Sequence, residues 1–157
     1  TVMLSMAAGR TIRFDESGVR AMGRSSRGVK GAKLLGDDQV VGMVVAEPDA
    51  FLLTASVNGY GKRTQLSDYP IKGRGGQGVI DIRTTERNGK VITAKFCREE
   101  DEAMFITESG MIVRTSIADI STVGRNTQGV RLVNLKDGDS LVSVERSHAH
   151  HLVRAWQ

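Results

Sequence analysis

A unit of about fifty residues occurs three times in this chain of 157 residues, and each copy carries a glycine-arginine turn that ends in Gly-Val. The three turns are Gly23-Arg-Ser-Ser-Arg-Gly-Val29, Gly73-Arg-Gly-Gly-Gln-Gly-Val79 and Gly124-Arg-Asn-Thr-Gln-Gly-Val130, so the first glycine recurs after 50 and then 51 residues. A period of this length is typical of repeat architectures, in which each unit packs against its neighbours. The repeat therefore predicts a series of similar modules.

Each unit contains about four short segments rich in Val, Ile, Leu and Thr, separated by Gly, Asn and Asp. Segments of this composition favour β-strands, and the pairs Asn58-Gly59 and Ser109-Gly110 suit hairpin turns, which need a positive φ. No stretch keeps a helical period over about twelve residues. Four strands per unit at this period predict an all-β fold of three propeller-like blades.

The register of the repeat sets the expected domain organisation. One domain is expected at residues 1–146, with repeats at about 1–49, 50–101 and 102–146. The tail, residues 147–157, matches no segment of the repeat and is expected to be disordered. Its three histidines could bind a metal, but a frayed chain end is the interpretation that we favour.

The charges follow the repeat. The formal net charge is +4, which favours an anionic partner without proving one. Basic residues gather at the turns and at the preceding hairpins, whereas acidic residues gather between units, as in Glu99-Glu-Asp-Glu102. If the blades lie side by side, the turns form a basic track suited to duplex DNA bent around the outside. Aromatic residues make up only 4% of the chain, which argues against a single-stranded ligand.

The candidate DNA-binding residues are the basic side chains of the turns, the hairpins and their flanks, and their expected role is contact with phosphates. They are Arg13, Arg24, Arg27, Lys30, Lys33, Lys62, Arg63, Lys72, Arg74, Arg114, Arg125 and Arg131. Four glycines of the second turn are expected to shape its loop, namely Gly73, Gly75, Gly76 and Gly78.

No set of residues indicates a catalytic centre, and we expect neither a metal nor a cofactor in this chain. The glycine-rich second turn lacks the Gly-Lys-Ser/Thr ending and the following helix of a nucleotide triphosphate site. Cys97 is the only cysteine, and its apolar surroundings favour a core residue over a nucleophile. A single cysteine cannot form a disulfide within the chain, which fits a reducing compartment. No signal peptide and no apolar run long enough to span a membrane is visible. We therefore expect a soluble, cytoplasmic protein.

Three stretches resemble the C-terminal domain of the DNA gyrase A subunit: Thr54-Ala-Ser-Val-Asn-Gly-Tyr-Gly-Lys-Arg-Thr64, Thr84-Thr-Glu-Arg-Asn-Gly-Lys90 and Val123-Gly-Arg-Asn-Thr-Gln-Gly-Val130. The resemblance covers roughly residues 1–146, and the topoisomerase IV A subunit is a weaker match. It implies a β-pinwheel, in which four-stranded blades share a hairpin with their neighbours, and DNA wrapping on a basic outer rim. It also implies membership of an ATP-dependent type II topoisomerase that introduces negative supercoils.

The partners that the resemblance implies are duplex DNA, the remainder of the gyrase A subunit and the gyrase B subunit, with no membrane. ATP and Mg²⁺ would act elsewhere in the holoenzyme. The nearest string to the gyrase hallmark box, Gln-Arg-Arg-Gly-Gly-Lys-Gly, is Lys72-Gly-Arg-Gly-Gly-Gln-Gly78, which lacks the leading Gln-Arg and the lysine. The chain therefore resembles the later blades of that domain.

Several alternatives stay open, on the assembly of the blades and on the function. Three units leave unpaired edges, so the blades form either an open arc or a homodimer that covers those edges. The protein could be the topoisomerase IV domain, or a propeller that docks another protein through its acidic junctions and binds no DNA. An enzyme that uses Cys97 or the histidine tail is the remaining rival.

Overall fold

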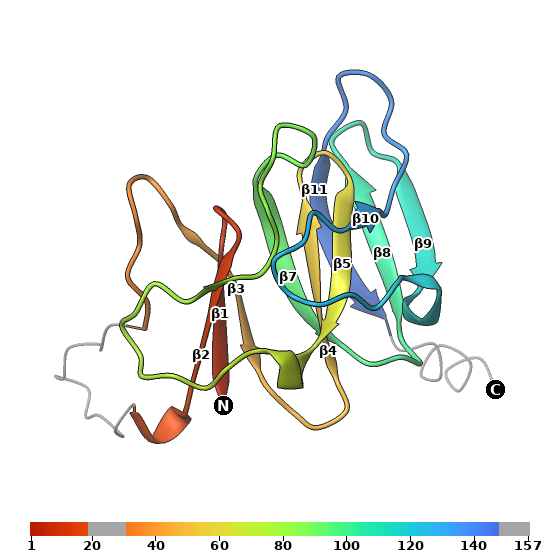
Figure 1. Cartoon of the computed structure of the whole chain (residues 1–157). Coiled ribbons are helices and arrows are strands. Elements are labelled where there is room, and N and C mark those ends of the chain that lie inside the picture. The colour runs from red at the N-terminus through yellow and green to blue at the C-terminus, as the bar shows by residue number, and fades with distance from the viewer. Residues whose placement is uncertain (19–30, 148–157) are drawn as a thin grey trace, which may run out of the picture.

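The computed structural model describes residues 1–18 and 31–147, and it contains three antiparallel sheets side by side (Figure 1). The strands are β1 (Val2–Met6), β2 (Arg10–Phe14), β3 (Val40–Val45), β4 (Phe51–Ser56), β5 (Tyr60–Gln65), β6 (Val79–Ile80), β7 (Val91–Cys97), β8 (Glu102–Thr107), β9 (Ile112–Ser116), β10 (Val130–Arg131) and β11 (Leu141–Ser147). Single 3-10 turns follow the second strand of each repeat, as η1 (Glu16–Gly18), η2 (Leu66–Asp68) and η3 (Ile117–Asp119). These turns are the helical elements of the described residues, and none is long enough to cross a membrane.

Each repeat opens with a β-hairpin whose turn glycine has a positive φ. Gly9, Gly59 and Gly110 have φ values of 100°, 88° and 91°, a region that favours glycine because it has no Cβ. The hairpins pair β1 with β2, β4 with β5 and β8 with β9. The strand and turn positions expected from the sequence are confirmed here.

The segment after each 3-10 turn crosses to the sheet of the preceding repeat. We call residues 66–83 the first crossing segment and residues 117–134 the second crossing segment. Strand β6 of the first pairs with β2, and β10 of the second pairs with β5. The sheet orders are therefore β3-β1-β2-β6, β10-β5-β4-β7 and β11-β8-β9. The all-β pinwheel is confirmed, although the shared element is a crossing segment with one short strand and not a whole hairpin.

The outermost strand of a blade thus comes from the next repeat, and the third sheet has three strands. No described strand pairs with the outer edge of β9. At the opposite edges, β7 lies between β3 and β11 and contacts both of them. The blades therefore meet along these three strands and present their crossing segments on the other side.

The hydrophobic core lies between blades and not within them. One cluster joins Leu53 and Cys97 of the second repeat to Phe105 and Leu141 of the third. A second cluster joins the first two repeats, where Met3 packs with residues that include Leu52 and Tyr69. Because burial of one large apolar side chain contributes about 1.5–3 kcal/mol, each blade depends on its neighbour for stability.

The glycine that precedes each crossing strand leaves no room for a side chain. A Cβ at Gly129, where φ is 71°, would lie 2.4 Å from the carbonyl oxygen of Gly61. A Cβ at Gly124 in the same segment would meet no atom within 4 Å, and its φ lies outside the positive range. These two glycines form a matched pair for substitution.

We expect Gly129→Ala to destabilise the protein by about 2 kcal/mol or more, because it combines a strained φ with a clash against backbone. Gly124→Ala should change the free energy of unfolding by less than about 0.5 kcal/mol. Urea denaturation followed by circular dichroism measures both values. Equal stability of the two variants would contradict the packing described for the crossing strand.

Candidate nucleic-acid interface

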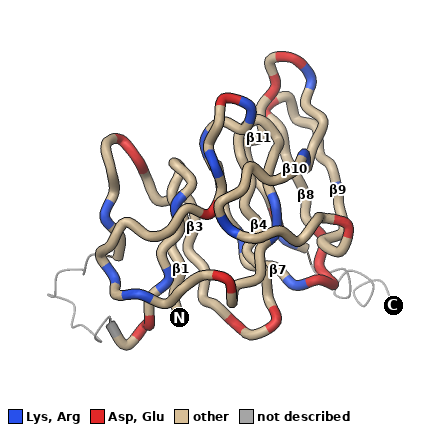
Figure 2. Tube along the Cα trace, viewed as in Figure 1, with Lys and Arg blue, Asp and Glu red and all other residues tan. Residues whose placement is uncertain are grey.

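Beyond their 3-10 turns, which carry the exposed Asp68 and Asp119, the two crossing segments are mainly basic. Residues 70–83 contain Lys72, Arg74 and Arg83, and their single acid, Asp81, is 1% exposed. Residues 120–134 contain Arg125 and Arg131 and no acid. Asp and Glu instead concentrate in loops at the upper and lower ends of the blades (Figure 2).

The predicted DNA-binding residues of these segments lie at the surface, where Arg125 and Arg131 have side-chain hydrogen bonds. Lys72, Arg74 and Arg131 are exposed, and Arg125 is half-buried. The Nε atom of Arg125 donates to the carbonyl oxygen of Asp68 at 2.9 Å. Arg131 donates to the hydroxyl of Tyr60 at 2.6 Å. Their guanidinium groups are thus oriented by the protein before any ligand arrives.

Lys33, which is also exposed, lies beside the second turn because its backbone N–H donates to the carbonyl oxygen of Gly76 at 2.7 Å. The candidates Arg24, Arg27 and Lys30 lie outside the described residues. The predicted basic set is therefore brought together in part, at and around the second turn.

Lys62 was expected to contact phosphate, and that expectation is wrong. Its side chain is fully buried, and its Nζ lies 3.0 Å from Oδ1 of Asp81. The Nζ also donates to the carbonyl oxygens of Asp81, at 2.7 Å, and Gly124, at 2.6 Å. Burial lowers the pKa of Lys62, and the nearby carboxylate of Asp81 opposes this shift. The ammonium is thus a structural group that fixes the start of the third turn.

Asp81 joins all three repeats. Its carboxylate accepts hydrogen bonds from Thr54 Oγ1 at 2.7 Å and from the hydroxyl of Tyr69 at 2.6 Å. Its backbone N–H donates to Gly9 of the first repeat at 2.9 Å, and its carbonyl accepts from the N–H of Asn126 in the third at 2.8 Å. Burial raises the pKa of Tyr69, and the Asp81 carboxylate adds to this shift. The hydroxyl therefore stays protonated and can donate.

The three arginines at equivalent hairpin positions have different surroundings. The Nη1 of Arg13 donates to the carbonyl oxygens of Leu66, at 2.8 Å, and Tyr69, at 3.2 Å. Arg63 is buried, with its Nε donating to the carbonyl oxygen of Ile120 at 2.7 Å. Arg114 is exposed, and it forms a long ion pair of 3.9 Å with Glu102.

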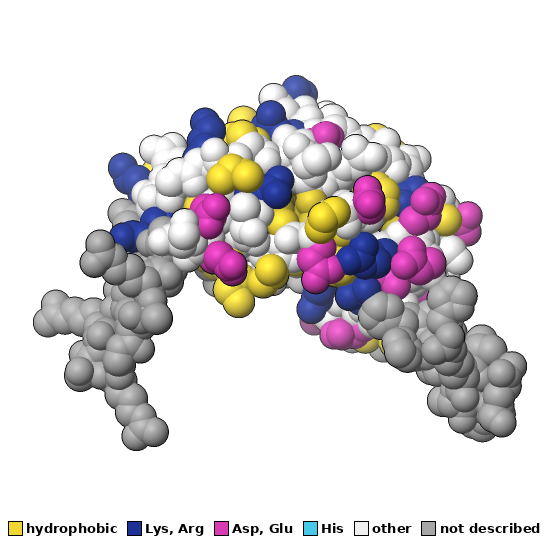
Figure 3. Space-filling view, turned by 90° about the horizontal axis from the view of Figure 1, so that it is seen from below, with side chains coloured by type: hydrophobic (Ala, Val, Ile, Leu, Met, Phe, Trp, Pro, Cys, Tyr) yellow, Lys and Arg dark blue, Asp and Glu magenta, His cyan; other side chains and the backbone are white. Residues whose placement is uncertain are grey.

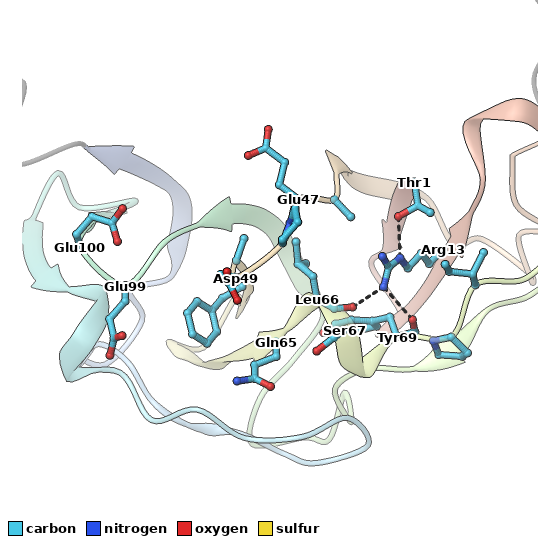
Figure 4. Close-up of a pocket in the computed structure, with 16 residues that line it drawn as sticks. Thr1, Arg13, Glu47, Asp49, Gln65, Leu66, Ser67, Tyr69, Glu99 and Glu100 are labelled. Carbon is cyan, nitrogen blue, oxygen red and sulfur yellow. Dashed lines mark hydrogen bonds between the residues drawn. The ribbon is translucent and has the colours of Figure 1, made fainter.

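These contacts correct the expectation for Arg63, whose guanidinium is buried and cannot reach a phosphate. Arg63 also stacks on the ring of Phe51, with 4.5 Å between the guanidinium carbon and the ring centroid. Arg13 is half-buried, and its guanidinium joins the first repeat to η2 of the second (Figure 4). The two side chains therefore clamp the next crossing segment in place.

Two of the four predicted loop-shaping glycines have a conformational reason to be glycine. Gly75 and Gly78 have φ values of 85° and 79°, and a Cβ at Gly78 would lie 2.5 Å from the carbonyl oxygen of Thr11. Gly73 and Gly76 have no positive φ, and a Cβ at Gly73 would meet no atom within 4 Å. The loop shape therefore does not depend on Gly73 or Gly76.

Two surface arginines were not among the candidates, although both contact the second crossing segment. The Nε of exposed Arg83 donates to the side-chain oxygen of Asn126 at 3.0 Å. Exposed Arg87 stacks on Tyr60 at 4.2 Å from the ring centroid and donates to the carbonyl oxygen of Gln128 at 3.1 Å. Arg83 lies three residues after the crossing strand β6, at the end of a basic segment, which is the signal that could have identified it.

A cleft between the first two blades is lined by four acidic residues and one basic residue. Glu47, Asp49, Glu99 and Glu100 line it together with apolar side chains, and Arg13 is its basic residue (Figure 4). In the view from below, Asp and Glu side chains lie over the centre and right of the molecule, among hydrophobic, Lys and Arg side chains (Figure 3). This charge is of the wrong sign for a phosphate ligand.

The described residues also include acidic side chains and one cysteine that a metal site could use. They contain no group of three His, Cys, Asp or Glu side chains that could hold a metal ion. The histidines of the tail lie outside the described residues. Cys97 is 1% exposed, and burial raises the pKa of its thiol to about 12, so the reactive thiolate is not formed near neutral pH.

Comparisons with known proteins agree on one family. The family model described as "DNA gyrase C-terminal domain, beta-propeller" matches residues 7–47, 50–98 and 101–148. The DNA gyrase A subunit of Salmonella typhimurium is 49% identical over 145 residues, which are 92% of this chain and 16% of that protein. The equivalent protein of Pseudomonas aeruginosa is 50% identical over 145 residues, again 92% of this chain and 16% of that protein. The chain thus spans less than a fifth of these relatives.

Solved structures share the fold. The structure of a DNA gyrase A C-terminal domain has a TM-score of 0.84 and 31% identity, and the match covers 93% of this chain and 50% of that one. The C-terminal domain of a DNA topoisomerase IV has a TM-score of 0.86 at 23% identity, covering 99% of this chain and 50% of that one. At that identity, the second likeness shows the fold alone.

Asp81→Ala should cost about 3–5 kcal/mol of stability, because it leaves the Lys62 ammonium buried without a counter-charge. The double variant Lys62→Met with Asp81→Asn should lose less, because it removes the buried charge and keeps an acceptor for Tyr69. Asp137→Ala, at an exposed position, is the control. Urea denaturation measures the free energy of unfolding of each variant. If Asp81→Ala lowered this free energy no more than the control does, the role of the Asp81–Lys62 pair would be contradicted.

Proposed function

Because this chain belongs to the family of DNA gyrase C-terminal β-propeller domains, we propose that it binds and wraps duplex DNA as part of a gyrase A subunit. One observation carries the proposal. Adjacent blades present their crossing segments on the same side of the arc, and these carry Lys72, Arg74, Arg83, Arg125 and Arg131 against exposed Asp68 and Asp119 and buried Asp81. Positive charges that recur from blade to blade suit a polyanion that follows the arc.

The chemistry is that of phosphate neutralisation. Each phosphate that a lysine or arginine neutralises releases counterions and contributes about 0.9 to the slope of log affinity against log salt. Contacts to phosphates carry no sequence information, so binding is expected to be non-specific. Bending 20–30 base pairs costs about 1–6 kcal/mol, which several contacts along an arc can offset.

The wider assignment follows from the family and extends beyond the length of this chain. In the proposed complex, the remainder of the A subunit cleaves DNA, and the B subunit uses ATP with Mg²⁺. Together with the DNA segment wrapped on this chain, these activities introduce negative supercoils. In this proposal, the present chain supplies the wrapping surface. The proposed place of action is the cytoplasm.

The cleft between the first two blades favours a second candidate function. Its lining combines the carboxylates of Glu47, Asp49, Glu99 and Glu100 with the apolar surfaces of Pro48 and Phe51. Such a lining suits a basic protein segment better than a nucleic acid. A propeller that docks another protein through this cleft is therefore the alternative.

The double variant Arg74→Ala/Arg125→Ala should bind duplex DNA longer than about 40 base pairs more weakly, with a salt slope lower by up to about 1.8. The matched control is Lys90→Ala/Lys136→Ala, which removes the same charge from exposed end loops and should change the slope less. Gel shifts over a range of salt concentrations measure both slopes.

Two results would count against the proposal. Equal slope changes in the two double variants would remove the crossing segments from the DNA contact. No salt-dependent binding by the unmodified protein would leave the docking cleft as the better candidate.

A further inference from the structure

The cleft between the first two blades has a charge pattern that the proposed DNA binding does not use. We call it the acidic cleft, and residues 46–51, 65–71 and 99–100 form most of its lining. Its volume is about 1010 Å³, at the upper limit of the range of about 300–1,000 Å³ that is typical of ligand pockets. The cleft is therefore large enough for a ligand of several residues.

Two of the four carboxylates in the acidic cleft have no counter-charge. Glu47 and Glu99 each form an ion pair with an arginine of the protein. Asp49 and Glu100 are exposed, and within the described part of the chain neither of them forms an ion pair. A cationic ligand can therefore pair with Asp49 and Glu100 without displacing an existing partner.

The basic residue of the lining does not neutralise these carboxylates, because its guanidinium is engaged elsewhere. The Nε of Arg13 donates to Oγ1 of Thr1 at 2.7 Å. Its Nη1 donates to the carbonyl oxygens of Leu66, at 2.8 Å, and Tyr69, at 3.2 Å. Figure 4 shows Glu100 at one end of the cleft and Arg13 at the other. The cleft therefore has an acidic end and a basic end, which gives a bound ligand a direction.

Apolar surface accompanies the charges of the acidic cleft. Pro70 and Ile71 follow Tyr69 at the basic end, and Ile71 is 57% exposed. Pro48 and the half-buried Phe51 add apolar surface near the carboxylates. A small cation would leave most of this surface in water, whereas a ligand with both cationic and apolar side chains would cover it. A segment of a protein has this combination.

We propose that the acidic cleft binds an extended cationic segment of a partner protein, with its Lys or Arg side chains at Asp49 and Glu100 and an apolar side chain against Ile71. This direction keeps the positive charges of the ligand away from Arg13. The inference goes beyond the proposed DNA binding and is compatible with it. Ile71 is followed by Lys72, the first basic residue of the first crossing segment, so the partner and the DNA would contact neighbouring parts of one segment.

The test is a titration of the isotope-labelled full chain with synthetic peptides, followed by NMR. The probe is the capped peptide Arg-Lys-Gly-Pro-Leu-Leu, which has its charges at one end and its apolar side chains at the other. A charge control, Glu-Glu-Gly-Pro-Leu-Leu, and an apolar control, Arg-Lys-Gly-Ser-Ser-Ser, each change one end. The probe should shift amides of residues 47–51 and 99–100, the charge control should not bind, and the apolar control should bind more weakly.

Substitutions in the protein test the two ends separately. Asp49→Asn/Glu100→Gln should weaken binding of the probe about three-fold or more, because two ion pairs are lost. Asn also tolerates the positive φ of 57° at position 49. The matched control, Glu86→Gln/Asp137→Asn, removes the same charge from exposed positions outside the cleft and should weaken binding less than about two-fold, because distant charges are screened. Ile71→Ser should weaken binding of the probe but not of the apolar control.

Several results would overturn the proposal. They are absence of saturable binding at millimolar probe, equal affinity for the probe and either control peptide, shifts centred outside the cleft, and equal losses in the two double variants. Gel shifts with duplex DNA on the same proteins separate the two functions, and Asp49→Asn/Glu100→Gln should still bind DNA. DNA binding without peptide binding would overturn this inference alone. Peptide binding without DNA binding would support it and count against the proposed wrapping.

Discussion

The buried pair of Asp81 and Lys62 is the interaction on which the relative placement of the repeats depends. Both charges are withdrawn from water, so each must be satisfied by a fixed partner. The charged groups find partners in the second and third repeats, such as Thr54 and Gly124, and the backbone of Asp81 adds a hydrogen bond to Gly9 of the first. A pair of this kind adds little net stability over an apolar equivalent, but it allows one arrangement and penalises the others.

The crossing segments do two tasks at once. Their backbone completes the sheet of the preceding repeat, and their side chains supply the exposed basic residues. The position of Arg125 is therefore set from two sides, by Lys62 holding the carbonyl of Gly124 and by its own bond to Asp68. The contacts that pack one blade against the next therefore also determine the spacing of the basic residues at the surface.

The sequence was sufficient for the repeat, the strands and the hairpin glycines, because periodicity and turn chemistry are local. It could not separate buried from exposed basic residues. Lys62 and Arg63 lie in a strand beside candidates that are at the surface, and the crossing segment of the next repeat covers them. Equivalent positions also differ, since Arg13 and Arg63 meet a crossing segment and Arg114 does not. Gly73 and Gly78 look alike as residues, yet their unlike backbone angles arise from tertiary contacts.

Exchange of outer strands also restricts how such a protein can change during evolution. Removal of the middle repeat would take β6 from the first sheet and leave β10 without β5, so two junctions would be lost with one module. Repeats can be gained or lost with less disturbance at the ends of the row, where one junction is affected. Variation in repeat number among related chains is therefore expected to arise by terminal growth and shortening more readily than by internal excision.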